Sequence, residues 1–120
     1  MVFRLKKGDL IDILAPGSFI DGDKNFQKGI EILKNWGLEI NENNSLSKKF
    51  VYFAGDDLSR FKELEKAQNS KLIIFAKGGW GSARLLEKEP SWQHGLMLGF
   101  SDTCSLLLSK YSQGLSLIHI

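Results

Sequence analysis

Two short, uninterrupted apolar segments constrain the fold of this chain more than any other feature. Residues 72–76 (LIIFA) and 96–100 (LMLGF) are each the length of a strand and carry no charged side chain. A strand that is apolar at every position buries both of its faces, as the central strands of a parallel sheet do. Because parallel neighbours are joined by crossover connections, usually helices, these segments predict an α/β fold with a mostly parallel sheet flanked by helices.

The rest of the chain supplies the alternating elements that such a fold needs. Further strands are expected at 10–15, at 38–40 as an edge strand, and at 115–120. Helices are expected at 82–88 and 103–111. This order of strands and helices is typical of a flavodoxin-like domain.

Two more helices are indicated by apolar side chains that recur every three or four residues. The first begins near Asp23 as its cap, ends at Gly37, and has an apolar stripe made of Phe26, Ile30, Leu33 and Trp36. The second is capped by Asp56 or Asp57 and has an apolar face made of Leu58, Phe61 and Leu64. Both stripes are expected to pack against the sheet.

Composition excludes several classes of protein. A chain of 120 residues with 42% hydrophobic and 25% charged residues fits one soluble globular domain. The net charge is only +2 and no basic stripe stands out, so no nucleic-acid partner is expected. No apolar run approaches the ~20 residues of a membrane span, and the first residues do not resemble a secretory signal. The single cysteine, Cys104, fits a reducing cytoplasm.

The corner after the strand at 96–100 is the sharpest candidate for chemistry. Gly99 and Phe100 lead into Ser101, where the backbone must turn from a strand into a helix. A serine on such an elbow presents its hydroxyl to a substrate, while the amides of the new helix face a developing oxyanion. The alternative is that Ser101 only caps the helix. The elbow also departs from the Gly-x-Ser-x-Gly form, because position 103 is Thr.

A glycine-rich segment at 77–82 (KGGWGS), here called the glycine loop, follows the other apolar strand. Its glycines allow backbone amides to approach a ligand closely. One amide from this loop and the amide of Asp102 would form a two-point oxyanion hole. The alternative, a phosphate cradle, lacks the sequence of a P-loop or a dinucleotide fingerprint, so no cofactor is expected. Trp80 either lines a substrate cleft or packs against the domain, and Arg84 is expected to have a structural or loop-ordering role rather than to bind a ligand.

The remaining reactive side chains have ordinary explanations. His94 and His119 lack further ligands at metal-binding spacing, so no metal site is expected. His119 is a poor candidate for the base of Ser101, because a strand residue has little freedom to meet the elbow. Cys104 is expected to pack inward, and the aspartates are read as helix caps and turn formers.

The ordered motifs of this chain resemble the LD-carboxypeptidases (muramoyl-tetrapeptide carboxypeptidases) and their microcin-immunity relatives. The resemblance extends over nearly the whole chain, and its most specific part is Gly-Gly-aromatic-Gly followed by Gly-aromatic-Ser-Asp. The matching pieces are KGD at 7–9, APGS at 15–18, GI at 29–30, WGL at 36–38, FAGDD at 53–57, KGGWG at 77–81, RLL at 84–86 and LGFSDT at 98–103.

The resemblance implies a serine hydrolase that needs no metal or organic cofactor. Ser101 matches the family's nucleophile, and Asp102 and Gly79 stand where its oxyanion-hole amides are expected. Gly78, Trp80 and Gly81 would contact substrate. Such enzymes remove the terminal D-amino acid from a cytoplasmic murein tetrapeptide during peptidoglycan recycling, which makes a murein peptide the expected partner.

The chain departs from that family in length. Its relatives run to more than twice 120 residues and take the Glu and His of a Ser–His–Glu triad from a second domain, whereas His119 matches a histidine that is not catalytic. Residues 1–120 are therefore expected to be a truncated, N-terminal, nucleophile-bearing domain that is inert or nearly so alone and prone to self-association through an uncovered face. Two alternatives stay open: a non-catalytic flavodoxin-like binding domain, and a related peptidase acting on a microcin-like peptide–nucleotide.

Overall fold

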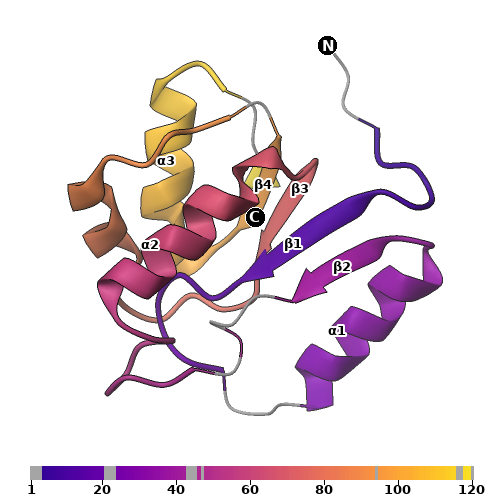
Figure 1. The fold of residues 1–120 in the computed structure, drawn as a ribbon, viewed down its shortest axis with the longest axis horizontal. Coiled ribbons are helices and arrows are strands. Elements are labelled where there is room, and N and C mark those ends of the chain that lie inside the picture. The colour runs from indigo at the N-terminus through magenta and orange to yellow at the C-terminus, as the bar shows by residue number, and fades with distance from the viewer. Residues whose placement is uncertain are drawn as a thin grey trace.

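The computed structural model describes residues 4–20, 24–42, 46, 48–93, 95–115 and 118–119 (Figure 1). Strands and helices alternate along the chain, as the two apolar segments predict. Their bounds, in order, are β1 (Leu10–Leu14), α1 (Lys24–Asn35), β2 (Glu39–Glu42), α2 (Asp57–Lys66), η2 (Ala67–Asn69), β3 (Leu72–Phe75), η3 (Ser82–Lys88), β4 (Leu96–Gly99), η4 (Ser101–Thr103), α3 (Cys104–Ser112) and β5 (Ile118–His119). The η elements are short 3₁₀ helices.

The five strands form one sheet in the order β2-β1-β3-β4-β5. Every pair is parallel, with Ile11 beside Ile40, Ile13 beside Ile74 and Ile73 beside Met97. This is the flavodoxin-like strand order, in which the chain changes direction across the sheet between β1 and β3. The predicted fold class is confirmed, and β2 lies at the edge of the sheet as expected.

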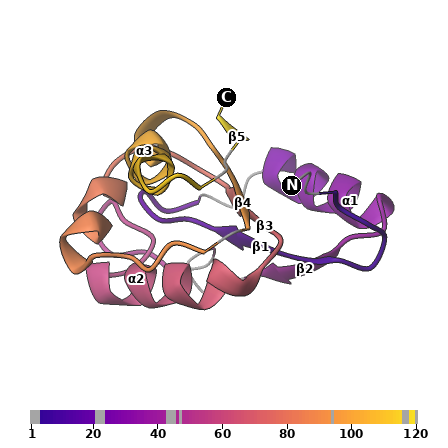
Figure 2. The ribbon, with the colours of Figure 1, turned by 90° about the horizontal axis from the view of Figure 1, so that it is seen from above.

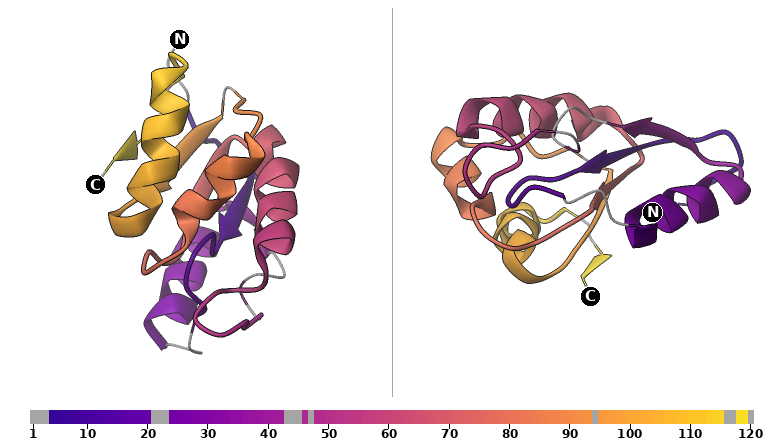
Figure 3. Two further views of the ribbon diagram at one scale, coloured as in Figure 1. Left: turned by 90° about the vertical axis from the view of Figure 1, so that its left-hand side faces the viewer. Right: turned by 90° about the horizontal axis from the view of Figure 1, so that it is seen from below.

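Helices cover both faces of this sheet (Figure 2). Alternate residues of β3 face opposite ways, as strand geometry requires. Leu72 packs with Ile11 and Leu38 on the side of α1, whereas Ile73 and Phe75 belong to the larger cluster on the side of α2. That larger cluster also takes in η3 and α3, and η3 lies between α2 and α3 (Figure 3).

Helix α1 confirms its predicted stop but corrects one member of its stripe. Gly37 has φ 85°, the left-handed conformation of a helix C-terminal glycine, and the amide of Leu38 bonds to Leu33 O at 3.3 Å. Trp36 was expected in the core, yet it is 68% exposed. At 3.6 residues per turn, position 36 lies roughly 90° from the centre of the stripe, and α1 already ends at Asn35.

Helix α2 corrects a second stripe. Asp56 is its N-cap and accepts a hydrogen bond from Ser59 N at 2.7 Å, as predicted. Leu58, expected on the buried face, is 51% exposed. Leu64 is fully buried and Phe61 packs partly buried against the core, as expected, while the polar Arg60 and, in η2, Ala67 also lie on the buried side. No helix in the described part of the chain is long and apolar enough to cross a membrane.

Candidate active site

Ser101 sits at a sharp corner between β4 and α3. Its φ is 55°, a left-handed conformation that a residue with a side chain rarely adopts and that costs about 1–3 kcal/mol. The corner is fixed by Thr103, which is fully buried. Its hydroxyl accepts from Phe100 N at 2.8 Å and donates to Phe100 O at 2.7 Å. Thr103 therefore closes the start of the helix, and the strain falls on Ser101.

The Ser101 side chain is exposed and faces the glycine loop. A Cβ placed on Gly78 would lie 3.0 Å from Ser101 Cβ and 3.3 Å from its Oγ, so loop and elbow are in direct contact. Among the residues that the structure describes, no hydrogen bond engages the Ser101 hydroxyl. The Ser101 hydroxyl does not cap α3, which was the alternative interpretation of this serine.

Asp102 joins the elbow to the far end of the glycine loop. Its Oδ2 accepts hydrogen bonds from the backbone amide of Ser82 at 3.0 Å and from the Ser82 hydroxyl at 2.7 Å. The backbone amide of Asp102 lies 3.2 Å from a Cβ placed on Gly78. The predicted oxyanion-hole amide thus borders the contact between loop and elbow.

The loop after β1 is hydrogen-bonded to the glycine loop. The Ser18 amide donates to Gly78 O at 3.3 Å, and the Ser18 hydroxyl accepts from Trp80 N at 2.9 Å. Gly79 has φ 85°, and a Cβ there would collide with the Ser18 side chain. The backbone on both sides of Gly79 is therefore held, while the Trp80 indole is 76% exposed rather than packed against the domain.

Arg60 on α2 reaches the same group of loops from beneath. It is buried, at 1% exposure. Its Nη1 donates to Gly81 O at 3.0 Å and also to Pro16 O, and its Nε donates to Gly55 O at 3.1 Å. Burial lowers the pKa of its guanidinium, and the neighbouring carboxylate of Asp57 works against that shift.

Asp57 lies between two arginines. Its carboxylate accepts from Arg60 Nη2 and from Arg84, whose Nε lies 3.0 Å from both oxygens and whose Nη2 lies 2.7 Å from one. Hydrogen bonding by Arg84 lowers the pKa of Asp57, and the same bonds raise the pKa of Arg84. Arg84 is thus occupied within the protein, which agrees with the structural role expected for it.

Other predicted residues lie away from this arrangement or outside the described chain. His94, Asp23 and the side chain of His119 fall outside the described residues, and Cys104, expected to pack inward, is half-buried on α3. Among the described residues no cluster of three His, Cys, Asp or Glu side chains could hold a metal ion.

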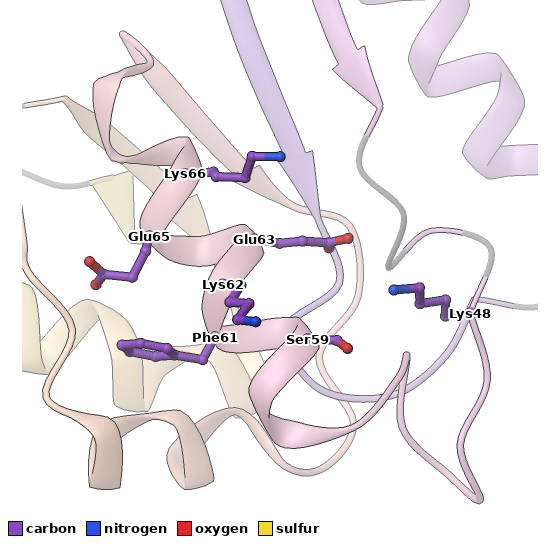
Figure 4. A pocket seen from close by; sticks show the side chains of 7 residues that line it. All are labelled: Lys48, Ser59, Phe61, Lys62, Glu63, Glu65 and Lys66. Carbon is purple, nitrogen blue, oxygen red and sulfur yellow. The ribbon is translucent and has the colours of Figure 1, made fainter.

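A hollow of about 450 Å³ runs along the outer face of α2 (Figure 4). Lys48 borders it from the loop before the helix, and charged side chains such as Lys62 and Glu63 border it from the helix itself. None of the predicted site residues lines it. It is a separate surface feature.

Sequence reasoning missed the residues that hold the site together, above all Ser18, Arg60 and Asp57. One signal for Arg60 was present in the sequence. It precedes Leu64 by four residues and Ala67 by seven, so a charged residue stands in the apolar stripe of a helix. A charge in such a stripe indicates a buried, hydrogen-bonded group. Ser18 follows a Pro-Gly turn, and no local pattern points to its partner 62 positions away.

Comparison with known proteins decides the family. Residues 11–120 match the model of the LD-carboxypeptidase N-terminal domain, peptidase family S66. The chain belongs to the LD-carboxypeptidase family. A curated relative from Synechocystis sp., which carries the provisional name of carboxypeptidase, is 33% identical over 96% of this chain. The chain spans 40% of that relative's length.

Solved structures give the same result. A muramoyltetrapeptide carboxypeptidase from Oxalobacter formigenes is 26% identical with a TM-score of 0.74, covering 88% of this chain and 38% of its own. An MccF-like protein from Bacillus anthracis is 25% identical with a TM-score of 0.86, covering 96% and 38%. The microcin C7 self-immunity protein MccF, at 23% identity and a TM-score of 0.81, covers 91% and 35% and shows the shared fold.

Proposed function

We propose that this chain carries the nucleophile of a serine-type LD-carboxypeptidase, which releases the terminal D-amino acid of a murein tetrapeptide. Membership of the family and likeness to a muramoyltetrapeptide carboxypeptidase support the reaction class. The observation that carries the proposal is Ser101 itself. It is exposed and strained at the carboxyl edge of the sheet, and its side chain contacts the glycine loop. In parallel sheets of this order, ligands bind at that edge.

The proposed reaction is acyl transfer through Ser101. Its Oγ attacks the scissile carbonyl carbon while a base takes the hydroxyl proton, and the carbonyl oxygen becomes an oxyanion held by the amides of Asp102 and Gly79. The C–N bond then breaks, the amine of the D-amino acid leaves with the proton from the base, and water hydrolyses the acyl-enzyme. Gly78, Trp80 and Gly81 border the place of the substrate.

The base is proposed to come from the second domain of the family, where the resemblance puts a Glu and a His. The chain spans about two fifths or less of the length of the relatives it matches. Loss of triad members lowers kcat by several orders of magnitude. We therefore expect residues 1–120 alone to be inert or nearly so.

The setting of this proposed reaction is peptidoglycan recycling in the cytoplasm. Serine acyl transfer needs no metal or organic cofactor. Self-association through an uncovered face stays a prediction, and sedimentation at increasing protein concentration tests it.

The second candidate is a peptidase acting on a peptide–nucleotide. It is supported by the fold shared with MccF, whose solved structures include a complex with aspartyl sulfamoyl adenosine. The same nucleophile would serve both reactions, so only the substrate distinguishes them.

The test measures release of the terminal D-amino acid from a murein tetrapeptide. It compares residues 1–120 with the longest polypeptide that the reading frame of this chain encodes. We expect turnover by a polypeptide that includes the second domain, abolished in Ser101→Ala and retained in Ser105→Ala. Turnover that survives Ser101→Ala would refute the proposal. Turnover of a peptide–nucleotide but not of the tetrapeptide would favour the second candidate.

A further inference from the structure

We propose that Arg60 is a positioning residue of this site: its buried guanidinium holds the glycine loop where the loop's amide can meet the oxyanion formed at Ser101. The inference rests on the proposed function, because it concerns the same acyl transfer. It adds a residue on the far side of the loop that touches neither Ser101 nor substrate.

The contacts of Arg60 are directed and come from separate parts of the chain. The side chain donates to the carbonyl oxygens of Pro16, Gly55 and Gly81 and to the carboxylate of Asp57. Pro16 follows β1, Gly55 precedes α2 and Gly81 lies in the glycine loop. Asp57 is the first residue of α2. One rigid, planar fork with five donors can satisfy such a set, and no other side chain can.

Burial of this charge is not explained by packing. Taking a guanidinium out of water is costly, and an apolar side chain of similar volume would fill the same space without that cost. What the guanidinium alone supplies is hydrogen bonds to the backbone carbonyls of three segments, at Pro16, Gly55 and Gly81. It also stacks 4.8 Å from the centre of the Phe53 ring, and a Cβ on Gly81 would lie 2.6 Å from that same ring.

Arg60 restrains the backbone around Gly79 in two ways. First, it donates a hydrogen bond of 3.0 Å to Gly81 O, two residues further along the loop. Second, it donates to Pro16 O and so holds the turn that leads to Ser18, whose hydroxyl accepts a hydrogen bond from Trp80 N at 2.9 Å. The loop is therefore tied on both sides of Gly79 before any substrate arrives. Oxyanion holes act through such preorganised donors, and loss of one donor costs about 10²–10³ in rate.

The probe for this inference is phenylboronic acid, which measures oxyanion binding without requiring a catalytic base. Ser101 Oγ forms a bond to boron, the hydroxyl proton passes to solvent, and boron becomes a tetrahedral anion. The dissociation constant is read by ¹¹B NMR on residues 1–120. Amide hydrogen exchange at Gly79 and Trp80 reports the loop directly.

The variants are Arg60→Ala and, as matched control, Arg84→Ala. Both remove an arginine from Asp57, but the Arg84 side chain has no bond to a loop carbonyl among the described contacts. We expect Arg60→Ala to weaken the adduct about tenfold or more and to speed amide exchange in the loop. Arg84→Ala should change the adduct by about twofold at most. Added ethylguanidinium should restore adduct formation in Arg60→Ala, which a general loss of stability would not allow.

The outcomes separate this inference from the proposed function. A wild-type chain that forms the adduct, with a folded Arg60→Ala that forms it equally well, overturns the role of Arg60 alone. A wild-type chain that forms no adduct overturns the proposed nucleophile, and the positioning role with it. If Arg60→Ala does not fold, Arg60→Lys takes its place. Lysine keeps the positive charge but lacks the planar group with several donors. Wild-type affinity for the boronate in Arg60→Lys therefore also overturns the inference.

Discussion

Ser101 combines a strained backbone with an exposed side chain. Its backbone is held in a left-handed conformation by Thr103, and its side chain stands exposed against Gly78. Strain of this kind persists only where the surrounding structure imposes it. Here the fully buried Thr103 and the hydrogen bond that the Ser82 hydroxyl donates to Asp102 impose it from either side.

The contact between Gly78 and Ser101 can be tested by adding one methyl group. In Gly78→Ala the new Cβ would lie 3.0 Å from Ser101 Cβ and 3.2 Å from Asp102 N, so loop and elbow must move apart. We expect boronate affinity to fall about tenfold while the fold is kept. Gly29→Ala is the control, because nothing lies within 4 Å of its Cβ, and it should stabilise α1 by about 0.5–1 kcal/mol. Unchanged affinity in Gly78→Ala would show that the two segments are not in contact.

Lys110 gives a pH-dependent prediction. It is buried on α3 with its Nζ bonded to Gly95 O, and burial lowers its pKa from 10.5 to about 8. Between those values the unfolded chain holds a proton that the folded chain has lost, so stability rises with pH. The free energy of unfolding of wild type relative to Lys110→Met should rise by up to ~3 kcal/mol from about pH 8 to about pH 10.5 and be flat below. Urea titrations across this range measure it, and a constant difference would contradict the burial of a charged amine.

At the scale of elements, the turn η4 fixes the position of Ser101 relative to the end of β4. β4 ends at Gly99, where a Cβ would lie 2.5 Å from Thr103 Oγ1 and 2.8 Å from the Phe75 ring. The chain can therefore turn only if position 99 has no side chain. The next residue, Phe100, is extended, and Ser101 then starts the turn.

Thr103→Val tests this turn. The variant keeps the shape of the side chain but leaves the Phe100 amide without its acceptor, so we expect a loss of about 1 kcal/mol in the free energy of unfolding. Boronate affinity should fall as well, because Ser101 is no longer forced into its strained conformation. Ser105→Ala, which removes a hydroxyl bonded to Asp102 O at 3.1 Å, is the control. A stable Thr103→Val with full affinity would mean that other contacts hold the elbow.

Local patterns in the sequence predict the elements well and their buried faces less well. The two apolar runs correctly predicted β3 and β4. The helix predicted at 82–88 has the bounds of η3. The stripes of α1 and α2 each included one exposed residue, Trp36 and Leu58. In α2 the polar Arg60 occupies the buried face, because its partners are backbone carbonyls that residue periodicity does not reveal.

At the scale of the whole molecule, the site is made where three loops converge. They follow β1, β3 and β4, neighbouring strands whose carboxyl ends share one edge of the sheet. Sequence order already placed Ser101 and the glycine loop at that edge. The contributions of Ser18 and Arg60 depended on the tertiary fold, because 62 positions separate Ser18 from Trp80 and 44 separate Arg60 from Pro16.

The most direct test of the account is formation of the phenylboronate adduct by residues 1–120, comparing wild type with Ser101→Ala and Ser105→Ala. The exposed Ser101 hydroxyl, which no hydrogen bond engages among the described residues, predicts a tetrahedral ¹¹B signal in wild type and in Ser105→Ala that disappears in Ser101→Ala. A signal that persists without the Ser101 hydroxyl, or that is absent from the wild-type chain, would contradict it.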